Sequence, residues 1–140
     1  MCGPGFVVRA ADSGDLAGVA AVAAETGVPL ADAREHLDRQ TLLVAVSAGE
    51  VIGLAATGEP DGSGVATLVG PMAGAAGFGL GVEKALLRRA VEQAAGRGVR
   101  VLCAHVPAGD PVRAQTFVAQ GFQRKPQPDV AGAFAFTKTL

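Results

Sequence analysis

Residues 65–87 read VATLVGPMAGAAGFGLGVEKALL, and this stretch decides the fold. Val65 to Val69 is apolar and contains β-branched side chains, which is typical of a strand. Gly70 to Gly81 is a loop of glycine and small residues. From Val82 to Ala95 the apolar residues recur at helical spacing, which predicts an amphipathic helix. The stretch therefore predicts a strand that leads through a glycine-rich loop into a helix.

A glycine-rich segment at the start of a helix can hold an anion. In Gly77-Phe78-Gly79-Leu80-Gly81, missing side chains let a phosphate approach the backbone. Unpaired N–H groups and the helix dipole then attract its charge. A Gly-x-Gly-x-Gly pattern is equally compatible with a plain flexible loop. We expect the anion to lie against Phe78, Gly79, Leu80, Gly81, Val82, Glu83 and Lys84.

Two nucleotide-binding motifs do not fit this loop. The dinucleotide fingerprint follows a strand directly and is paired with an acidic residue at the end of the next strand. Here the loop begins well beyond Val69, and the next strand ends in Ala104-His105-Val106 without a carboxylate. The Gly-Lys-Ser/Thr of nucleotide hydrolases is absent. The sequence disfavours both classes.

The rest of the chain alternates strands and helices around this stretch. The first helix begins after an Asp12-Ser13 cap and ends at Gly27, and the last runs from Asp110 to a Gly121-Phe122 end. The order β-α-α-β-β-β-α-β-α-β predicts an α+β domain with a mixed, mostly antiparallel sheet flanked by helices. The remaining elements are expected at Phe6–Arg9, Leu30–Arg39, Thr41–Val46, Val51–Ala56, Val99–Val106 and Ala133–Thr137.

Composition narrows the range of functions. At 140 residues the chain has room for one domain, expected to span 1–140. A formal net charge of -1 disfavours a nucleic-acid partner. No apolar run predicts a membrane partner, and no signal-peptide pattern is present, so we expect a cytoplasmic protein. Cys2 and Cys103 support neither a disulfide framework nor a metal site.

Several fragments follow one another in an order that points to a family. They are Arg9-Ala10-Ala11, Gly49-Glu50-Val51-Ile52-Gly53, Val65 to Pro71, Gly79-Leu80-Gly81 with Ala85-Leu86-Leu87, and Asp110 to Gly121-Phe122. Together they resemble the GCN5-related N-acetyltransferases over almost the whole chain. The resemblance implies an acyl-CoA N-acyltransferase-like fold and acetyl-CoA as cosubstrate. It also implies that the exposed backbone of the fourth strand, at Leu68, Val69 and Gly70, contacts the thioester end of the coenzyme.

The glycine turn departs from that family's pattern, which is Arg/Gln-x-x-Gly-x-Gly/Ala. With the Leu86-Leu87 pair in register, Phe78 stands where the basic or amide residue belongs and Glu83 where the last small residue belongs. A shifted register places Gly79 and Gly81 on the small positions but displaces the leucine pair. A carboxylate at Glu83 repels a diphosphate unless it points outward or pairs with Lys84 or Arg88.

The catalytic residues that the resemblance implies are also missing. The family's thiolate acid is a tyrosine, and Phe117 occupies its position in a chain without tyrosine. Its base, a glutamate on the fourth strand, has no counterpart in Val65 to Val69. His105 is the candidate acid or base because its pKa suits either role. Glu59, at the turn before that strand, is the second candidate. An ordinary strand-end histidine and an ordinary polar turn explain the two residues more simply than catalytic roles do.

Two functions follow from these residues. The first is acetyl-CoA-dependent N-acetylation of a small-molecule or peptide amine by direct transfer, in which positioning supplies much of the rate. The second is a non-catalytic or repurposed domain of the same fold that binds an acyl-CoA, another ligand or a protein. The apolar strand at Ala133 to Phe136 also makes a homodimer possible.

Overall fold

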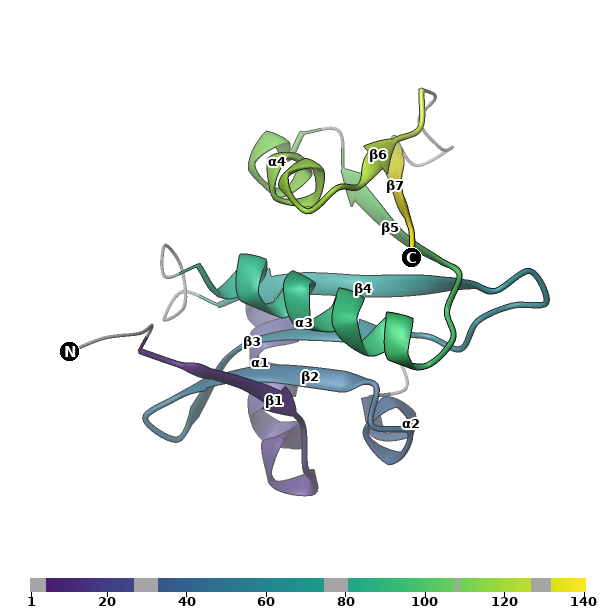
Figure 1. The fold of residues 1–140 in the computed structure, drawn as a ribbon. Coiled ribbons are helices and arrows are strands. Elements are labelled where there is room, and N and C mark those ends of the chain that lie inside the picture. Colours follow the sequence, from purple (N-terminus) through teal and green to yellow (C-terminus); the bar gives the residue numbers. More distant parts are fainter. Residues whose placement is uncertain (1–4, 27–32, 75–80, 108, 127–131) are drawn as a thin grey trace.

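The computed structural model describes residues 5–26, 33–74, 81–107, 109–126 and 132–140 (Figure 1). They form an α+β domain around a seven-stranded sheet in the order β1-β2-β3-β4-β5-β7-β6. The β4–β5 pair is parallel and the other pairs are antiparallel. The strands are β1 (Val7–Ala10), β2 (Leu42–Ser47), β3 (Glu50–Thr57), β4 (Val65–Ala73), β5 (Val101–Pro107), β6 (Gln123–Arg124) and β7 (Ala133–Thr139). The helices are η1 (Ser13–Asp15), α1 (Leu16–Thr26), α2 (Ala33–Asp38), α3 (Val82–Gly96) and α4 (Pro111–Ala119).

The predicted order of elements is confirmed, with three differences. Strand β4 continues to Ala73, so the loop expected from Gly70 begins later. Strand β5 begins at Val101 rather than Val99, because the Val99 N–H donates to the Ala94 carbonyl and closes α3. The two-residue strand β6 was not predicted, since both of its residues are exposed and it is too short to show a pattern.

Strand β4 contains a β-bulge that reverses its faces. On β3, Leu54 pairs with Met72 and Ala56 pairs with Val69, so β4 carries one extra residue between these pairs. Gly70 lies in this bulge with φ 93°, where a Cβ atom would meet the Leu54 carbonyl oxygen at 3.0 Å. Before the bulge Leu68 packs in the cluster under α3, and after it Met72 packs in the cluster under α1. Pro71, which follows the bulge, lies inside β4, although the expected strand ended at Val69.

Helices cover the two faces of the sheet unequally. Helix α1 packs Val19 and Val22 onto one face of β2, β3 and β4. The larger cluster lies on the opposite face, where α3 and α4 both pack. Neighbouring residues of β2 divide between the clusters, because successive strand side chains point to opposite faces. The larger cluster is built mainly from Leu43, Ala55, Leu68, Leu86, Leu87, Ala90, Leu102, Ala104, Phe117 and Phe136.

The start of α3 is positioned by a glycine on β3. A Cβ atom at Gly53 would meet Val82 Cγ1 at 2.5 Å and the Met72 carbonyl oxygen at 2.8 Å. Val82 is buried, so the first turn of α3 lies directly on the sheet at this point. The second glycine of the Gly49-Glu50-Val51-Ile52-Gly53 fragment is thus explained by the close packing of α3 on β3.

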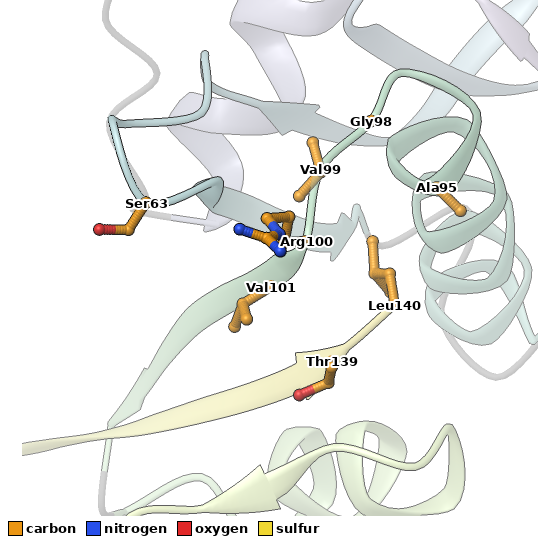
Figure 2. A pocket seen from close by; sticks show the side chains of 8 residues that line it. All are labelled: Ser63, Ala95, Gly98, Val99, Arg100, Val101, Thr139 and Leu140. Atoms are coloured by element: carbon orange, nitrogen blue, oxygen red, sulfur yellow. The ribbon is translucent and has the colours of Figure 1, made fainter.

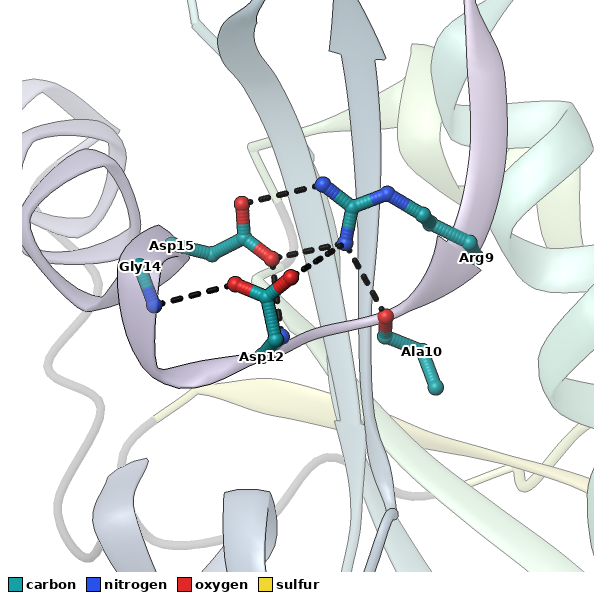
Figure 3. Close-up of polar contacts among 5 residues, drawn as sticks. All are labelled: Arg9, Ala10, Asp12, Gly14 and Asp15. Carbon is teal, nitrogen blue, oxygen red and sulfur yellow. Dashed lines mark hydrogen bonds and ion pairs between the residues drawn. The ribbon is translucent and has the colours of Figure 1, made fainter.

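An ion pair fixes the entrance to the first helix (Figure 3). The Arg9 guanidinium donates to both oxygens of Asp15, at 2.7 and 3.2 Å. Asp15 also accepts from the Asp12 N–H, and Asp12 accepts from the Gly14 N–H, which completes a capping box. The pKa of Asp15 is lowered, first by its hydrogen bond with Arg9. The predicted cap at Asp12 and Ser13 is confirmed.

Candidate functional site

Strands β4 and β5 separate partway along their length. Their parallel register runs from Val65 opposite Val101 to Leu68 opposite Ala104. Beyond these pairs β4 continues to Ala73 and β5 to Pro107, and the two strands diverge (Figure 1). Helices α3 and α4 follow β4 and β5, so both helices begin at the diverging end. The three β4 residues expected to contact a ligand through their backbone, Leu68, Val69 and Gly70, lie where the separation begins.

A cavity of about 700 Å³ lies at this end of the sheet. It is bordered by the end of β4, by the first turns of α3 and α4, and by the last turn of α1. Its lining residues are Glu25, Thr26, Ala73, Gly74, Glu83, Asp110, Val112 and Arg113. Residues from four separate elements therefore surround one space, which the sequence alone did not bring together.

The first turn of α3 lacks a side-chain cap. Its N-cap is Gly81, in the left-handed conformation with φ 78°, and no side chain within the described ranges accepts from the N–H groups of that turn. A Cβ atom at Gly81 would have no heavy atom of the described residues within 4 Å, apart from its chain neighbours. The N-terminus of α4 is different, because Asp110 accepts from the Arg113 N–H at 3.1 Å. Of these two helix N-termini, the α3 terminus is the one without a side-chain cap in the described residues.

Glu83 and Arg113 link the two helix starts. Arg113 Nε lies 3.6 Å from Glu83 Oε2 and 3.6 Å from Asp110 Oδ2. The side chains of Arg113 and Glu83 are 19% and 29% exposed. Burial raises the pKa of Glu83, Arg113 opposes this shift, and Asp110 adds to it. The sequence left open whether Glu83 points outward or pairs with Lys84 or Arg88, and the structure places it beside Arg113 on the neighbouring helix.

Polar groups at the cavity fit an anionic ligand. Within the described residues, Arg113 Nε is buried and has no hydrogen-bond acceptor at bonding distance and angle. The uncapped N–H groups of Val82 and Glu83 lie at the α3 start beside it. The half-buried Arg113 and a helix N-terminus favour a phosphate group, whereas the carboxylates of Glu25, Glu83 and Asp110 oppose one. Of the expected cofactor-binding residues, Phe78, Gly79 and Leu80 lie outside the described residues.

Lys84 lies beside the cavity rather than in it. It is exposed on α3 and lines a neighbouring space of about 270 Å³ with Val112, Gln115, Thr116 and Ala119 of α4. This space lies between α3 and α4. Lys84 therefore places a second positive charge near the α3 start.

His105 lies one residue beyond the last β4–β5 pair. It is exposed on β5 opposite Ala135 of β7, and its neighbours Ala104 and Val106 are buried under α3 and α4. Its side chain therefore points to the other face of the sheet. Cys103 shares that face, and burial raises the pKa of its thiol while Lys125 opposes the shift. The position at the divergence keeps His105 as a candidate.

Glu59 lies at the opposite end of the sheet. Its carboxylate is 3.4 Å from Arg39 Nε, and its side chain is 54% exposed. Glu59 borders a cavity of about 100 Å³ that Gln93 and Arg97 of α3 also line. Helix α3 spans 15 residues, or about 22 Å, so this end is far from Gly81. The structure does not bring Glu59 together with the other candidates.

A second hollow lies at that far end (Figure 2). It has a volume of about 530 Å³ and is bordered by the end of α3, the start of β5 and the end of β7. Figure 2 shows Arg100 and Ser63 on one side and Leu140 and Thr139 on the other. None of the residues expected to bind or react lines it.

Phe117 is a core residue. Its ring is fully buried, meets Phe122 edge-on with centroids 5.0 Å apart, and stacks on Phe136 at 5.8 Å. These contacts explain an aromatic residue at this position without a catalytic role. No group of three or more metal-binding side chains occurs among the described residues. Within the same part of the chain, no helix is long and apolar enough to cross a membrane.

Asp110 and Arg113 are the site residues that sequence reasoning missed. The signal that could have found them is the parallel order of β4 and β5. The ends of adjacent parallel strands meet at one edge of a sheet, so the helices that follow them begin together. An Asp-Pro-Val-Arg start of the second helix then lies near the glycine turn of the first.

Solved structures share this fold. No model of a known protein family matches the sequence, and no curated protein sequence matches it. A ribosomal-protein-alanine N-acetyltransferase from Brucella melitensis superposes with a TM-score of 0.77 and 25% identity over 96% of this chain and 99% of that one. The acetyltransferase YncA from Salmonella typhimurium, solved with acetyl-CoA, has a TM-score of 0.81 and 20% identity over 96% and 94%. Naa50 from Arabidopsis thaliana, solved with the bisubstrate analogue CoA-Ac-MVNAL, has a TM-score of 0.81 and 13% identity over 97% and 99%.

These superpositions define the class of the molecule as an acyl-CoA N-acyltransferase-like fold. The chain therefore shares its fold with the GCN5-related N-acetyltransferases. The family resemblance drawn from the sequence fragments is thereby confirmed.

Proposed function

We propose that residues 1–140 form a single-domain N-acetyltransferase that uses acetyl-CoA and acts on a small-molecule or peptide amine. The observation that carries this proposal is the divergence of β4 from β5 beyond Leu68 and Ala104, with the uncapped start of α3 at its open end. That arrangement offers backbone groups to an extended ligand arm and a positive helix terminus to its phosphates. Two of the superposed structures contain acetyl-CoA or a CoA-based analogue.

Bound acetyl-CoA would supply the thioester whose C–S bond breaks as the amine nitrogen forms a C–N bond. The backbone of β4 around Leu68, Val69 and Gly70 would hold the thioester end, with Gly70 in the bulge leaving room for it. Gly81, Val82 and Lys84 would hold the phosphate end. His105 would accept the proton that the amine loses. The departing thiolate would take its proton through water, since Phe117 has none to give.

A carboxylate on the α1 side of the cavity supports an amine as acceptor. Glu25 lines the cavity from the last turn of α1, and a carboxylate at this position would attract a protonated amine. Naa50 and the ribosomal-protein-alanine enzyme show peptide and protein acceptors for related folds. The sequence-based expectations of a cytoplasmic location, no nucleic-acid partner and a homodimer remain predictions.

A non-catalytic acyl-CoA-binding domain is the second candidate. The buried, fully packed Phe117 at the position of the family's tyrosine favours it. Both functions require the same ligand, so they differ only in turnover.

Thermal unfolding with acetyl-CoA, followed by thiol release, separates the two functions. At a concentration of about 100 times its Kd, the coenzyme should stabilise the protein by about 2.7 kcal/mol. Thiol release that depends on an added amine, and that falls in His105→Gln, establishes the enzyme. Stabilisation without release across a panel of small amines and N-terminal peptides establishes the binding domain. No stabilisation at millimolar acetyl-CoA contradicts both.

A further inference from the structure

The guanidinium of Arg113 is held beside two carboxylates without being hydrogen-bonded through its Nε. The distance of 3.6 Å to each of Glu83 and Asp110 exceeds that of a charge-assisted hydrogen bond. Elsewhere in the chain the Arg9–Asp15 pair closes to 2.7 Å. The buried Nε–H of Arg113 therefore has charge nearby but no acceptor within the described residues. Such a donor loses hydration without gaining a bond, which favours an acceptor that arrives from the cavity.

The charges around Glu83 are unbalanced. Arg113 and Asp110 face it from α4, Lys84 is its neighbour on α3, and Glu25 lines the same cavity from α1 with an interaction of its own. One buried cation thus serves two carboxylates. The raised pKa of Glu83 agrees with this imbalance, because burial dominates and Asp110 adds to it. Glu83 is the less well satisfied of the two carboxylates, since Asp110 also caps α4.

We propose that Arg113 is the phosphate-binding cation of this site, and that Glu83 competes with the ligand for it. The inference rests on the proposed function and names the residue that replaces the basic one absent at Phe78. When a phosphate enters beside the α3 start, Arg113 donates to it instead of remaining with Glu83. Glu83 then faces the ligand's negative charge without a cation, and it takes up a proton.

Proton uptake by Glu83 has a definite sign. A group that binds a proton more tightly in the complex than in the free protein makes affinity rise as the pH falls. The affinity for acetyl-CoA should therefore increase from about pH 8 to about pH 5, in excess of any change that the coenzyme's own phosphate causes. Glu83→Gln removes the carboxylate, so it should abolish this additional pH dependence of the affinity and leave only the part that the coenzyme's own phosphate causes.

Calorimetric titration of the whole chain with acetyl-CoA tests the competition. Arg113→Gln should weaken binding roughly tenfold, Arg113→Lys less, and Glu83→Gln should tighten it several-fold. In the double variant the gain from Glu83→Gln should shrink, because no cation is left to release. The matched controls are Arg88→Gln and Glu92→Gln, which remove the same charges from exposed positions of α3 and should change affinity by less than about twofold.

Three results would overturn the inference. They are unchanged affinity in Arg113→Gln, an equal gain from Glu83→Gln with and without Arg113, and the same pH dependence in wild type and Glu83→Gln. If Arg113→Gln does not fold, Arg113→Lys and the pH comparison still decide the question. Failure of the wild type to bind acetyl-CoA contradicts the proposed function itself, whereas binding that none of these substitutions changes contradicts only the role of Arg113 and Glu83.

Discussion

Helix α3 is bounded at both ends by a glycine with nearly the same backbone conformation. Gly81 has φ 78° and Gly98 has φ 82°. At the C-terminal end, Gly98 and Val99 turn the chain so that their N–H groups donate to Ala95 and Ala94, which satisfies carbonyls of the last turn. At the N-terminal end, Gly81 leaves the first N–H groups without a side-chain partner. A glycine of nearly the same conformation thus accompanies a C-terminus whose carbonyls are hydrogen-bonded, here called the closed end, and an N-terminus without a side-chain cap, here called the open end.

Cavities lie at both ends of the helix. The open end faces about 700 Å³ of space that the first turn of α3 helps to line, whereas the closed end borders spaces of about 100 and 530 Å³ lined by the last turn of α3 and the residues that follow it. A terminus that only needs stability satisfies its own polar groups. A terminus that binds a ligand keeps its polar groups available for hydrogen bonds to the ligand, and this lowers the stability of the unbound protein. Substitutions at each end should therefore separate binding from stability.

The largest effect is expected for Gly81→Asp. A carboxylate at the open end repels phosphate and competes for the uncapped N–H groups, so acetyl-CoA affinity should fall about 100-fold, or roughly 3 kcal/mol. Gly81→Asn has the same shape and tolerates positive φ equally well, so it should retain most of the affinity. Titration calorimetry of both variants checks this. Equal losses would show that shape rather than charge matters at this end.

Gly98→Ala should have the opposite profile. An alanine at φ 82° is strained by about 1–2 kcal/mol, so the free energy of unfolding in urea should fall by that amount while acetyl-CoA affinity stays unchanged. The control is Gly96→Ala, inside the last turn of α3 with no heavy atom near its Cβ position. It should be neutral or stabilising. A loss of affinity in Gly98→Ala would contradict the separation of the two ends.

Protonation of Asp15 and of Glu83 should change the free energy of unfolding in opposite directions. Asp15 lies at the capped start of the first helix, and Glu83 lies at the uncapped start of α3. Asp15, at the capped first helix, has a lowered pKa, so its stabilisation is present above the unfolded-state value of 3.8 and is lost as the pH falls through the folded-state pKa. Glu83 has a raised pKa, so folding becomes more favourable as the pH falls through that pKa toward the unfolded-state value of 4.5. Urea unfolding at a series of pH values checks both signs. Asp15→Asn should remove the first dependence and Glu83→Gln the second.

The smallest effect is expected for Thr57→Val at the closed end. The Thr57 hydroxyl is buried and has no partner in the described structure, so an isosteric methyl group removes an unsatisfied atom and should change stability by less than about 0.5 kcal/mol. Thr41→Val, whose hydroxyl lies 3.0 Å from His36 Nδ1, is the matched control and should cost about 1 kcal/mol. A similar loss in both would show that an ordered water bonds to Thr57.

The sequence predicted the elements with local signatures and missed those that depend on distant residues. The Asp12 cap, the periodicity of Val82 to Ala95 and the glycine end at Gly98 are local, and the structure has all three. The bulge at Gly70 depends on the register with β3, which no local pattern encodes. Pairing of Glu83 with Arg113 depends on two helices that start 29 residues apart, at Val82 and Pro111, and meet only because β4 and β5 are parallel.

The four register pairs between β4 and β5 also have a mechanical consequence. They are the only strand pairing, within the described residues, between the β1-β2-β3-β4 part of the sheet and the β5-β7-β6 part. In mechanical terms the sheet consists of two parts that are joined along the short line of these β4–β5 pairs. We expect bending to be concentrated along that line, so that a small change in the angle between the two parts would alter the width of the open edge most while the β4–β5 pairs stay formed.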